Sequence, residues 1–354
     1  MNKKKVLIIG PSPTNSKGGM ATVIQEMLES KVLNNNFNLK IHESYRDGNV
    51  FYRLLFSIYA FIKFLFLYNE YDIFHIHMAS YGSTFRKGLY INFLSKKNKK
   101  IILHIHGAEY LVFYNKLSKS KKQKVKNIWN KSHTIIVLSK KWKKEFQNIF
   151  KNLNILEVNN GINIDKLSSG ISDVCINKYK FLLLGRLGKR KGAYDIIKAT
   201  EHIYSKYPSL KIFMAGDGEV EKVKQVIEEK KLSNSVEIVG WTNFNKKLQL
   251  LKEVSTILLP SYNEGLPMTI LEGMATGKMI IASSVGAIPE VIENGKNGIL
   301  ILPGDIENLA KAMEKVMKNE NNFLESCSQN NINKAKEKYS TEVMHNKILE
   351  IYNS

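Results

Sequence analysis

The chain has 354 residues, of which 53 are Lys or Arg and 32 are Asp or Glu, so its formal net charge is +21. With 44% hydrophobic and 24% charged residues, the composition is that of a globular protein and excludes a disordered, collagen-like or disulfide-stapled chain. Two cysteines, Cys175 and Cys327, form neither a disulfide framework nor a cysteine metal cluster, which favours a reducing cytoplasm.

The positive charge is concentrated in the first part of the chain. Residues 1–150 contain 26 basic and 8 acidic residues, whereas residues 151–354 contain 27 and 24. A basic surface attracts nucleic acid, anionic lipid headgroups or phosphorylated substrates. Codon bias toward lysine is the alternative explanation, but such a bias should enrich lysine equally in residues 1–150 and 151–354. The sequence has no helix-turn-helix, zinc-finger or RNP-type pattern, so we expect no nucleic acid partner.

The N-terminal region contains one apolar run that invites a membrane interpretation. The first apolar run, Val6–Ile9, is ended by Gly10 and Pro11 and is too short for the apolar core of a signal peptide, but it suits a buried strand. The run Leu54–Tyr68 is longer, but it contains Lys63 and falls short of the roughly 20 residues that a spanning helix needs. We therefore predict a helix that is either packed in the core or placed at a membrane interface.

Short apolar runs alternate with helical patterns along the whole chain, which predicts an α/β fold with parallel sheets covered on both faces. The strands predicted in the first half are Lys5–Ile9, Leu39–His42, Ile73–His77, Ile101–His106, Thr134–Leu138 and Ile155–Val158. Those predicted in the second half are Lys180–Leu184, Leu210–Ala215, Val236–Val239, Thr256–Leu259, Met279–Ala282 and Ile299–Leu302. The pattern predicts two Rossmann-like parallel-sheet domains in tandem.

The domain boundary is expected in the turn-rich stretch Asn159–Asn163 and the polar connection Ser168–Gly170. We therefore predict domains at residues 1–163 and 164–339. A break at Tyr339–Ser340 starts a last helix, at about residues 340–354, which we expect to pack back on the first domain.

Glycines after the first strand allow a close backbone approach to a ligand. Gly18 and Gly19 do not form the G-x-G-x-x-G fingerprint, and no acidic residue ends the second strand, so a nicotinamide dehydrogenase is disfavoured. An ordinary turn is the alternative for this pair of glycines.

Four histidines lie near the ends of two predicted strands. His75 and His77 belong to one strand, and His104 and His106 to the next. Residues at i and i+2 share a face of a strand, so His104 and His106 are expected to point the same way. Nearby carboxylate ligands are missing, so we expect no metal here; His75, His77 and His104 are interpreted as core or acceptor-lining residues.

A helix N-terminus is predicted directly after the strand Thr256–Leu259. Pro267 stands at the expected first helical position, where its missing N–H costs nothing. The backbone that leads into this helix would then form a diphosphate site at the carboxyl edge of the sheet. Its residues are Gly265, Leu266, Pro267 and Met268.

Two glutamates flank this predicted anion site. Glu264 lies in the loop and Glu272 lies about one and a half turns into the helix. Because carboxylates repel a diphosphate, their expected partners are neutral hydroxyl groups. A sugar nucleotide supplies both the anion and the hydroxyls. For Glu272, an ordinary position on the helix surface is the alternative.

The Glu264-x7-Glu272 signature resembles that of the retaining glycosyltransferases of family 4, which have the GT-B architecture of two Rossmann-like domains facing a central cleft. Further resemblances follow in family order along nearly the whole chain. They are the segments Pro11–Met20, His104–Gly107, Asn159–Asn163, Gly185–Gly192 and Ala215–Gly218.

The resemblance implies a role for each matching residue. Arg186 and Lys191 would bind the donor diphosphate, since both follow a buried strand and offer a fork and a point charge; a merely solvated loop is the alternative, because Lys189 and Arg190 lie between them. His106 would contact the transferred sugar near its reacting carbon. Glu264 would hold hydroxyls of that sugar and Glu272 those of the ribose. The glycine turn at Gly216 and Asp217 would line the donor site.

Taken together, the resemblance implies a metal-independent hexosyltransferase (EC 2.4) with an N-terminal acceptor domain and a C-terminal nucleotide-sugar domain. Uridine is the base expected from family frequency, with guanosine next, and the donor is a substrate rather than a cofactor. Retention by a front-face route is implied, in which the leaving diphosphate helps to remove the acceptor proton.

The first-domain segments that contain Gly18, Gly19, His75 and His77 are similar to those of enzymes that build capsule, lipopolysaccharide and other surface glycans. We therefore expect a glycan or lipid-linked acceptor, an anionic membrane surface as a partner, and a cytoplasmic location at the inner face of the cell membrane. A non-catalytic GT-B subunit that stabilises a partner enzyme is the alternative function.

Overall fold

The computed structural model describes residues 3–16, 18–168 and 177–354. Cys175 and the Ser169–Gly170 part of the predicted connection lie outside these residues. The chain forms two compact units, one of residues 1–161 and 341–354 and the other of residues 162–340. Each unit contains one six-stranded sheet, and all strand pairs in both sheets are parallel. The α/β prediction with two Rossmann-like sheets is confirmed.

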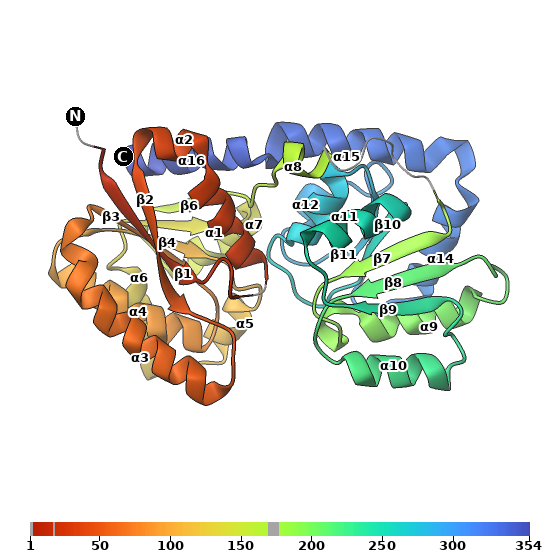
Figure 1. Cartoon of the computed structure of the whole chain (residues 1–354), viewed down its shortest axis with the longest axis horizontal. Helices are drawn as coiled ribbons and strands as arrows, with labels where there is room; N and C mark the ends of the chain where they lie inside the picture. Colours follow the sequence, from red (N-terminus) through yellow and green to blue (C-terminus); the bar gives the residue numbers. More distant parts are fainter. Residues whose placement is uncertain (1–2, 17, 169–176) are drawn as a thin grey trace. The chain divides into compact units, whose positions relative to one another are not determined.

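The sheet of the first unit has the strand order β2-β1-β3-β4-β5-β6 (Figure 1). Its strands are β1 (Lys5–Pro11), β2 (Asn38–Tyr45), β3 (Ile73–Met78), β4 (Lys100–Ile105), β5 (Thr134–Val137) and β6 (Ile155–Glu157). All residues of β3 and β5 are buried, as expected for parallel strands that are covered on both faces.

Eight α-helices belong to the described part of the first unit. They are α1 (Gly19–Glu29), α2 (Lys31–Asn36), α3 (Val50–Leu67), α4 (Gly82–Lys96), α5 (Tyr110–Asn115), α6 (Lys119–Trp129), α7 (Lys140–Ile149) and α16 (Thr341–Asn353), with a 3-10 turn at Tyr68–Glu70. The C-terminal helix α16 packs on α2, and its Tyr352 ring contacts Phe37 edge-on with ring centroids 5.2 Å apart.

The sheet of the second unit has the order β12-β11-β10-β7-β8-β9. Its strands are β7 (Lys180–Leu184), β8 (Lys211–Ala215), β9 (Val236–Gly240), β10 (Thr256–Leu259), β11 (Met279–Ser283) and β12 (Ile299–Ile301). Its α-helices are α8 (Ile164–Ser168), α9 (Ala193–Ile203), α10 (Val220–Glu229), α11 (Phe244–Glu253), α12 (Met268–Ala275), α13 (Ile288–Val291), α14 (Ile306–Lys318) and α15 (Phe323–Tyr339), with 3-10 turns at Lys189–Lys191 and Glu320–Asn322.

Helix α3 (Val50–Leu67) begins four residues before the predicted apolar run Leu54–Tyr68. It begins at Val50, where the side chain of Asn49 accepts a hydrogen bond from the Tyr52 N–H. With the following 3-10 turn, residues 50–70 are long and apolar enough, by length and composition alone, to cross a membrane, yet only 11% of the apolar window is buried. The prediction of a helix packed in the core is therefore wrong, because only Ala60 and Phe64 of α3 are buried.

Candidate functional site

The order of the strands in the second unit marks the place where a ligand is expected. From β7 the chain continues to β8 and β9 on one side and then returns to place β10 on the other side of β7. The loops after β7 and β10 therefore leave their common edge in opposite directions. Ligands of open α/β sheets bind at the carboxyl edge of such a switch point.

Positive-φ glycines allow the loops at this edge to approach one another closely. Gly192, after the 3-10 turn Lys189–Lys191, has φ +72°, and a Cβ there would lie 2.2 Å from the Pro260 carbonyl oxygen. Gly216, after β8, has φ +157°, and a Cβ there would lie 1.8 Å from the Gly185 carbonyl oxygen. Larger residues at these positions would push the loops apart.

A buried ion pair connects the two loops. The Nζ atom of Lys191 lies 2.6 Å from Oε1 of Glu264, and the side chains are 10% and 7% exposed. Arg190 is more exposed; its NH1 group donates to the Asn263 carbonyl at 3.2 Å and lies 3.8 Å from the same Glu264 oxygen. The structure thus brings together two residues that the sequence assigned to one donor site.

The backbone of Glu264 rests on a glycine that the sequence reasoning missed. Gly286 has φ +56°, and a Cβ at this position would lie 1.9 Å from the Glu264 carbonyl oxygen. The neighbouring Ala287 N–H donates to the Gly265 carbonyl at 3.0 Å. A glycine close after the buried strand β11 and just before Pro289, at the start of α13, was the available signal.

Helix α12 follows this loop at the carboxyl edge, but it begins one residue later than predicted. Pro267 is the N-cap, with φ −72° and ψ 129°, and Met268 is the first helical residue. The Pro267 carbonyl accepts a hydrogen bond from the Ile270 N–H at 3.1 Å. Proline fits here because an N-cap contributes its carbonyl, and not its N–H, to the helix. Leu266 and Met268 are both buried.

Glu272 is a second buried carboxylate with a lysine partner. Its Oε1 atom lies 2.5 Å from Nζ of Lys247, and the side chains are 8% and 22% exposed. The alternative of an ordinary glutamate on the helix surface is therefore wrong. Lys247 belongs to α11, where its ammonium also lies over the Phe244 ring at 5.4 Å. Its sequence context, an amphipathic helix with two adjacent lysines, gave no signal of this contact.

Arg186 stands apart from these ion pairs. Its side chain is exposed, and it has no ion-pair partner among the described residues. The Leu187 N–H donates to the Asp217 carbonyl at 2.6 Å, and the Gly185 N–H to the Ala215 carbonyl at 2.9 Å. These bonds hold the loop that carries Arg186 beside the turn at Gly216 and Asp217, so a guanidinium is available to an anion at the same edge.

The first unit has its own switch point, between β1 and β3. Gly18 follows β1 and is the N-cap of α1, with φ +113° and no atom within 4 Å of a Cβ built there; Gly19 is the first helical residue. The glycine at position 18 is thus required by its backbone conformation, and both a ligand site and an ordinary turn remain compatible with it.

The four histidines form a hydrogen-bonded column at the ends of β3 and β4. The register places His77 opposite His104. His106 is the first residue after β4 and not its last, and its N–H donates to the Met78 carbonyl at 2.8 Å. The rings of His104 and His106 lie 4.1 Å apart between centroids, so the prediction that they point the same way is confirmed.

Two ring-to-ring hydrogen bonds join the histidines of the two strands. Nδ1 of His77 lies 2.8 Å from Nε2 of His106, and Nε2 of His75 lies 3.2 Å from Nδ1 of His104. Nδ1 of His75 in turn contacts the Tyr352 hydroxyl at 2.8 Å. Burial lowers the pKa of His75 and of His106 to about 3, so these rings are neutral.

His75, His77 and His104 place one ligand atom each within 4.8 Å of one another, which raises the question of a metal ion. The planes of the His75 and His77 rings are only 9° apart, and their centroids are separated by 4.6 Å. An imidazole binds a metal in the plane of its ring, so two stacked rings cannot share one ion. The geometry therefore disfavours these three histidines as a joint metal site.

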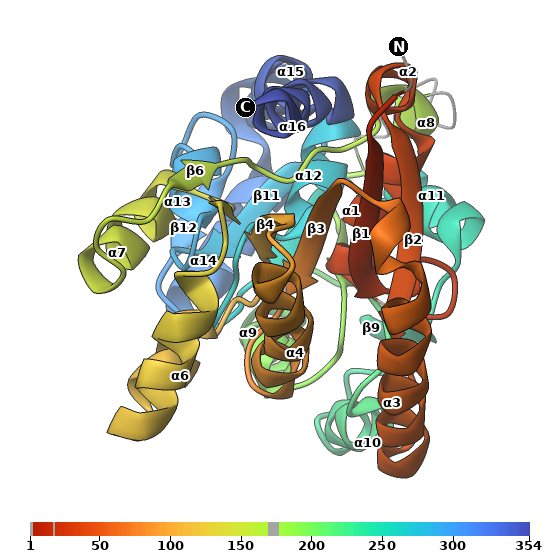
Figure 2. The ribbon, with the colours of Figure 1, turned by 90° about the vertical axis from the view of Figure 1, so that its left-hand side faces the viewer.

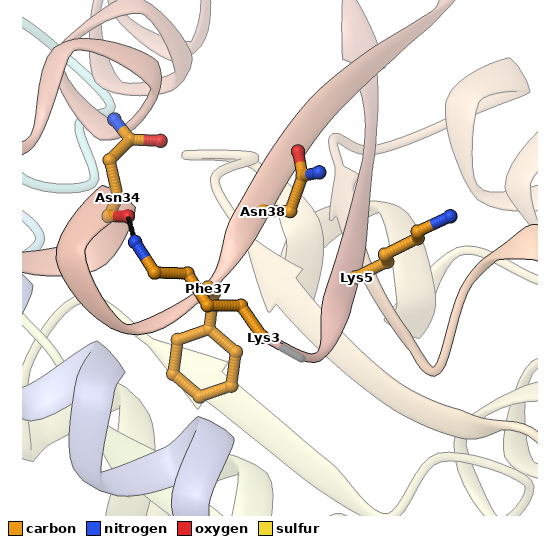
Figure 3. A pocket seen from close by; sticks show the side chains of 5 residues that line it. All are labelled: Lys3, Lys5, Asn34, Phe37 and Asn38. Carbon is orange, nitrogen blue, oxygen red and sulfur yellow. Dashed lines mark hydrogen bonds between the residues drawn. The ribbon is translucent and has the colours of Figure 1, made fainter. Parts of the chain in front are cut away.

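A cavity of about 440 Å³ lies at the opposite, amino edge of the first sheet (Figure 3). It is lined by Lys3, Lys5, Asn34, Phe37 and Asn38, and the Lys3 ammonium donates to the Asn34 carbonyl at 2.9 Å. Since ligands of open α/β sheets bind at the carboxyl edge, the cavity is not the candidate site.

Comparisons with known proteins match both halves of the chain to glycosyltransferases. Residues 18–166 match the family model described as Glycosyltransferase Family 4, and residues 174–334 match the model described as Glycosyl transferases group 1. An uncharacterized glycosyltransferase of Methanocaldococcus jannaschii is 29% identical over 238 residues, which are 64% of this chain and 60% of the relative.

A poly(glycerol-phosphate) alpha-glucosyltransferase of Bacillus subtilis is 31% identical over 180 residues, which are 50% of this chain and 26% of the relative. The chain thus spans less than two thirds of the length of these curated relatives. Among solved structures, the Anabaena protein HepE in complex with UDP-glucose superposes with a TM-score of 0.77 and 18% identity, covering 99% of both chains. At this identity the likeness shows the fold.

Proposed function

We propose that the chain transfers a sugar from a nucleoside-diphosphate donor to an acceptor, with retention at the anomeric carbon. The premise is that it belongs to the glycosyltransferases that join a Family 4 domain to a group 1 domain. The observation that carries this proposal is the Lys191–Glu264 pair at the switch point of the second sheet, with Arg186 exposed beside it. A nucleotide sugar needs cations for its diphosphate and an acceptor of hydrogen bonds for its hydroxyls, and this edge supplies both.

The chemistry asked of these residues is electrostatic. Arg186 and Lys191 bind the diphosphate and stabilise the charge that develops on it as the bond to the sugar breaks. The N-terminus of α12, with the backbone of Gly265 and Met268, adds the favourable end of a helix dipole. No covalent intermediate on a glutamate is needed: in the front-face route that we propose, the leaving phosphate oxygen takes the acceptor proton.

The two carboxylates hold hydroxyl groups in this proposal. Glu264 accepts hydrogen bonds from hydroxyls of the transferred sugar, and Glu272 accepts them from the ribose. Each charged acceptor holds a hydroxyl about twice as strongly as a neutral one would. His106, a neutral imidazole after β4, is the residue that we propose to contact the transferred sugar from the first unit.

The donor is proposed to be a UDP-sugar, used without a metal ion. Support for the uridine base comes from the solved structure of HepE with UDP-glucose, which shares the fold. The acceptor is proposed to be a glycan or lipid-linked oligosaccharide of the cell surface. The matching Bacillus subtilis relative is named for the glucosylation of poly(glycerol-phosphate), a chain of alternating phosphate and polyol groups. We place the enzyme in the cytoplasm, at the inner face of the cell membrane.

Two measurements test the proposal in sequence. Thermal unfolding is recorded with UDP, GDP and ADP, since a ligand that binds only the folded form raises the melting temperature. Slow hydrolysis of a panel of nucleotide sugars then identifies the sugar. Stabilisation by UDP together with hydrolysis of a UDP-sugar supports the enzyme. A protein that neither binds a nucleoside diphosphate nor hydrolyses any donor would instead fit the non-catalytic subunit.

A further inference from the structure

Helix α3 exposes an apolar surface that water does not favour. At 100° per residue, its outward arc is formed by residues that repeat in steps of three and four. They are Phe51, Leu54, Leu55, Ile58, Tyr59, Ile62, Leu65 and Phe66, and all are exposed, Phe66 by 85% and Phe51 by 70%. Monomeric proteins rarely expose a contiguous apolar patch of this kind without a binding partner.

The inward side of α3 is firmly attached to the unit. Phe64 is fully buried and contacts the ring of Tyr90 on α4, with centroids 4.9 Å apart. Tyr68, just after α3, packs edge-on against Phe93 of α4. Helix α3 is therefore a fixed part of a layer and presents the same arc outward. Figure 2 shows α3, α4 and α6 running side by side in this layer.

The positive charge of the layer formed by α3, α4 and α6 favours an anionic binding partner. Helices α3, α4, α5 and α6 contain no acidic residue, and α6 alone has five lysines between Lys119 and Lys126. On α4, which packs between Phe64 of α3 and helix α6, Leu89 is a further exposed apolar residue, at 55%. A second copy of the chain would bring the same positive charge against itself, which opposes self-association through this face. Anionic lipid offers negative headgroups to the lysines and acyl chains to the apolar arc.

We propose that α3 lies in the plane of an anionic membrane and inserts its outward arc below the headgroups, while the lysines of α6 bind the lipid phosphates. Helices of this type bury one apolar face in the boundary between headgroups and acyl chains. The inference deepens and rests on the membrane part of the proposed function, because it names the element that holds the first unit at the surface. Insertion of α3 as a membrane-spanning helix would break the contacts of the buried Phe64 side chain with Tyr90.

The test is sedimentation of the full chain with vesicles of phosphatidylcholine alone or mixed with phosphatidylglycerol. The variant Ile62→Asp/Phe66→Asp changes two exposed residues of the arc, and Leu302→Asp/Tyr204→Asp makes the same change of charge at exposed apolar positions of the second unit. We expect binding to the mixed vesicles, a loss of about tenfold or more in the α3 variant, and wild-type binding in the control.

Each other outcome overturns the inference. Wild-type protein that ignores anionic vesicles, or an α3 variant that binds them as well as the control does, removes α3 as the anchor. A dimer that the α3 variant dissociates in analytical ultracentrifugation assigns the arc to a second copy instead. Donor hydrolysis is measured on the same samples. Hydrolysis without vesicle binding defeats this inference alone, and vesicle binding without hydrolysis defeats the proposed activity alone.

A second inference comes from the hydrogen bonds of the histidine column. In the bond between Nδ1 of His77 and Nε2 of His106, one neutral ring donates and the other accepts. The other nitrogen of His77, Nε2, is buried and has no partner among the described residues. If His77 accepts the bond, that Nε2 carries a proton buried without an acceptor. If His77 donates, Nε2 carries only a lone pair.

Buried donors without partners are rarer than buried acceptors without partners, so the second arrangement is favoured. His77 then donates from Nδ1, His106 accepts at Nε2, and the proton of His106 must sit on its Nδ1. We infer that His77 is a positioning residue that fixes His106 as an Nδ1–H donor. In the proposed function, the Nδ1–H group of His106 would donate a hydrogen bond to an oxygen of the transferred sugar, and would not accept one from a sugar hydroxyl.

Nuclear magnetic resonance of protein with 15N-labelled imidazole rings tests the tautomer directly, and loss of a signal in His106→Asn assigns it. We expect Nδ1–H at His106 in the wild type and in His77→Asn, whose amide N–H takes the place of Nδ1–H. In His77→Leu we expect His106 to shift toward the Nε2–H tautomer, with kcat of donor hydrolysis lowered about tenfold and KM changed less.

An Nε2–H tautomer in the wild-type spectrum, or an unchanged tautomer in a folded His77→Leu, overturns the assignment. If His77→Leu does not fold, the wild-type spectrum alone decides. The spectrum does not depend on turnover. Absence of donor hydrolysis would therefore count against the proposed activity, while the wild-type spectrum would still test the His106 tautomer.

Discussion

Replacement of Gly286 by alanine tests whether the position of Glu264 matters for donor chemistry. A Cβ at Gly286 would lie 1.9 Å from the Glu264 carbonyl oxygen, whereas a carbon–oxygen contact needs about 3.3 Å. The Glu264 backbone must therefore retreat by about 1.4 Å, which breaks the hydrogen bond from the Ala287 N–H to the Gly265 carbonyl. A shift of about 1 Å at a reacting group lowers the rate about a hundredfold.

The stability effect has two parts. Alanine in the left-handed region costs about 1–2 kcal/mol, and the lost hydrogen bond adds about 1 kcal/mol. Gly295→Ala is the matched control, because Gly295 has φ +79° and no atom lies within 4 Å of its Cβ, so it carries the backbone strain without the clash. The second unit of Gly286→Ala should melt several degrees below that of Gly295→Ala.

The assay is hydrolysis of the preferred nucleotide sugar, measured as kcat/KM, together with thermal unfolding. We expect Gly295→Ala to hydrolyse the donor nearly as fast as the wild type, and Gly286→Ala to be about a hundredfold slower. A folded Gly286→Ala with hydrolysis within threefold of Gly295→Ala would refute the reasoning, because Glu264 would then tolerate displacement.

Three further predictions concern the same fold. Arg186→Ala should lower donor hydrolysis about a hundredfold, equivalent to about 3 kcal/mol of transition-state stabilisation, whereas Lys189→Ala in the same loop should have little effect. Glu272→Gln should weaken UDP binding by about tenfold, seen as a smaller thermal shift with UDP. Acid should destabilise the first unit: burial lowers the pKa of His42 to about 4 and of His75 to about 3, from 6.5, so the unfolded chain binds protons that the folded chain refuses. Their stabilisation is present above pH 6.5 and decreases as the pH falls, by about 2 kcal/mol per ring at pH 5. Hydrogen exchange at pH 7 and pH 5 measures this, and equal protection of the first unit at both values would contradict it.

The strands could be predicted because parallel strands buried on both faces are short apolar runs between turns. Their ends were less predictable. Strand β1 continues to Pro11, beyond the predicted Ile9, because Gly10 and Pro11 still pair with β2. His106 was predicted inside a strand that ends at Ile105. An apolar run cannot show where the neighbouring strand stops pairing, and that neighbour decides where a strand ends.

The candidate site could be predicted where a residue lies in the loop that follows a strand, as Arg186 does after β7 and Glu264 after β10. It was not predictable where a contact joins distant elements. The pairing of Glu272 with Lys247 depends on how α11 packs against the unit, and the exposure of α3 depends on which of its faces meets β2 and α4. The sequence shows that α3 has apolar residues on both faces. It does not show which face is buried and which is exposed, because protein cores and membranes favour the same side chains.

Two ion pairs reduce the electrostatic repulsion between the carboxylates and the diphosphate at the proposed donor site. Two carboxylates beside a diphosphate should repel it, yet each carboxylate here has its own lysine: Lys191 lies 2.6 Å from Glu264 and Lys247 lies 2.5 Å from Glu272. The negative charge of the site is therefore compensated before the donor arrives. An ammonium has three N–H groups, so Lys191 can keep Glu264 and still donate to a phosphate oxygen. In the proposed function, Glu272 shares Lys247 with a ribose hydroxyl, which brings no charge. Donor binding would then add net negative charge chiefly beside Lys191 and beside Arg186, which has no ion-pair partner among the described residues.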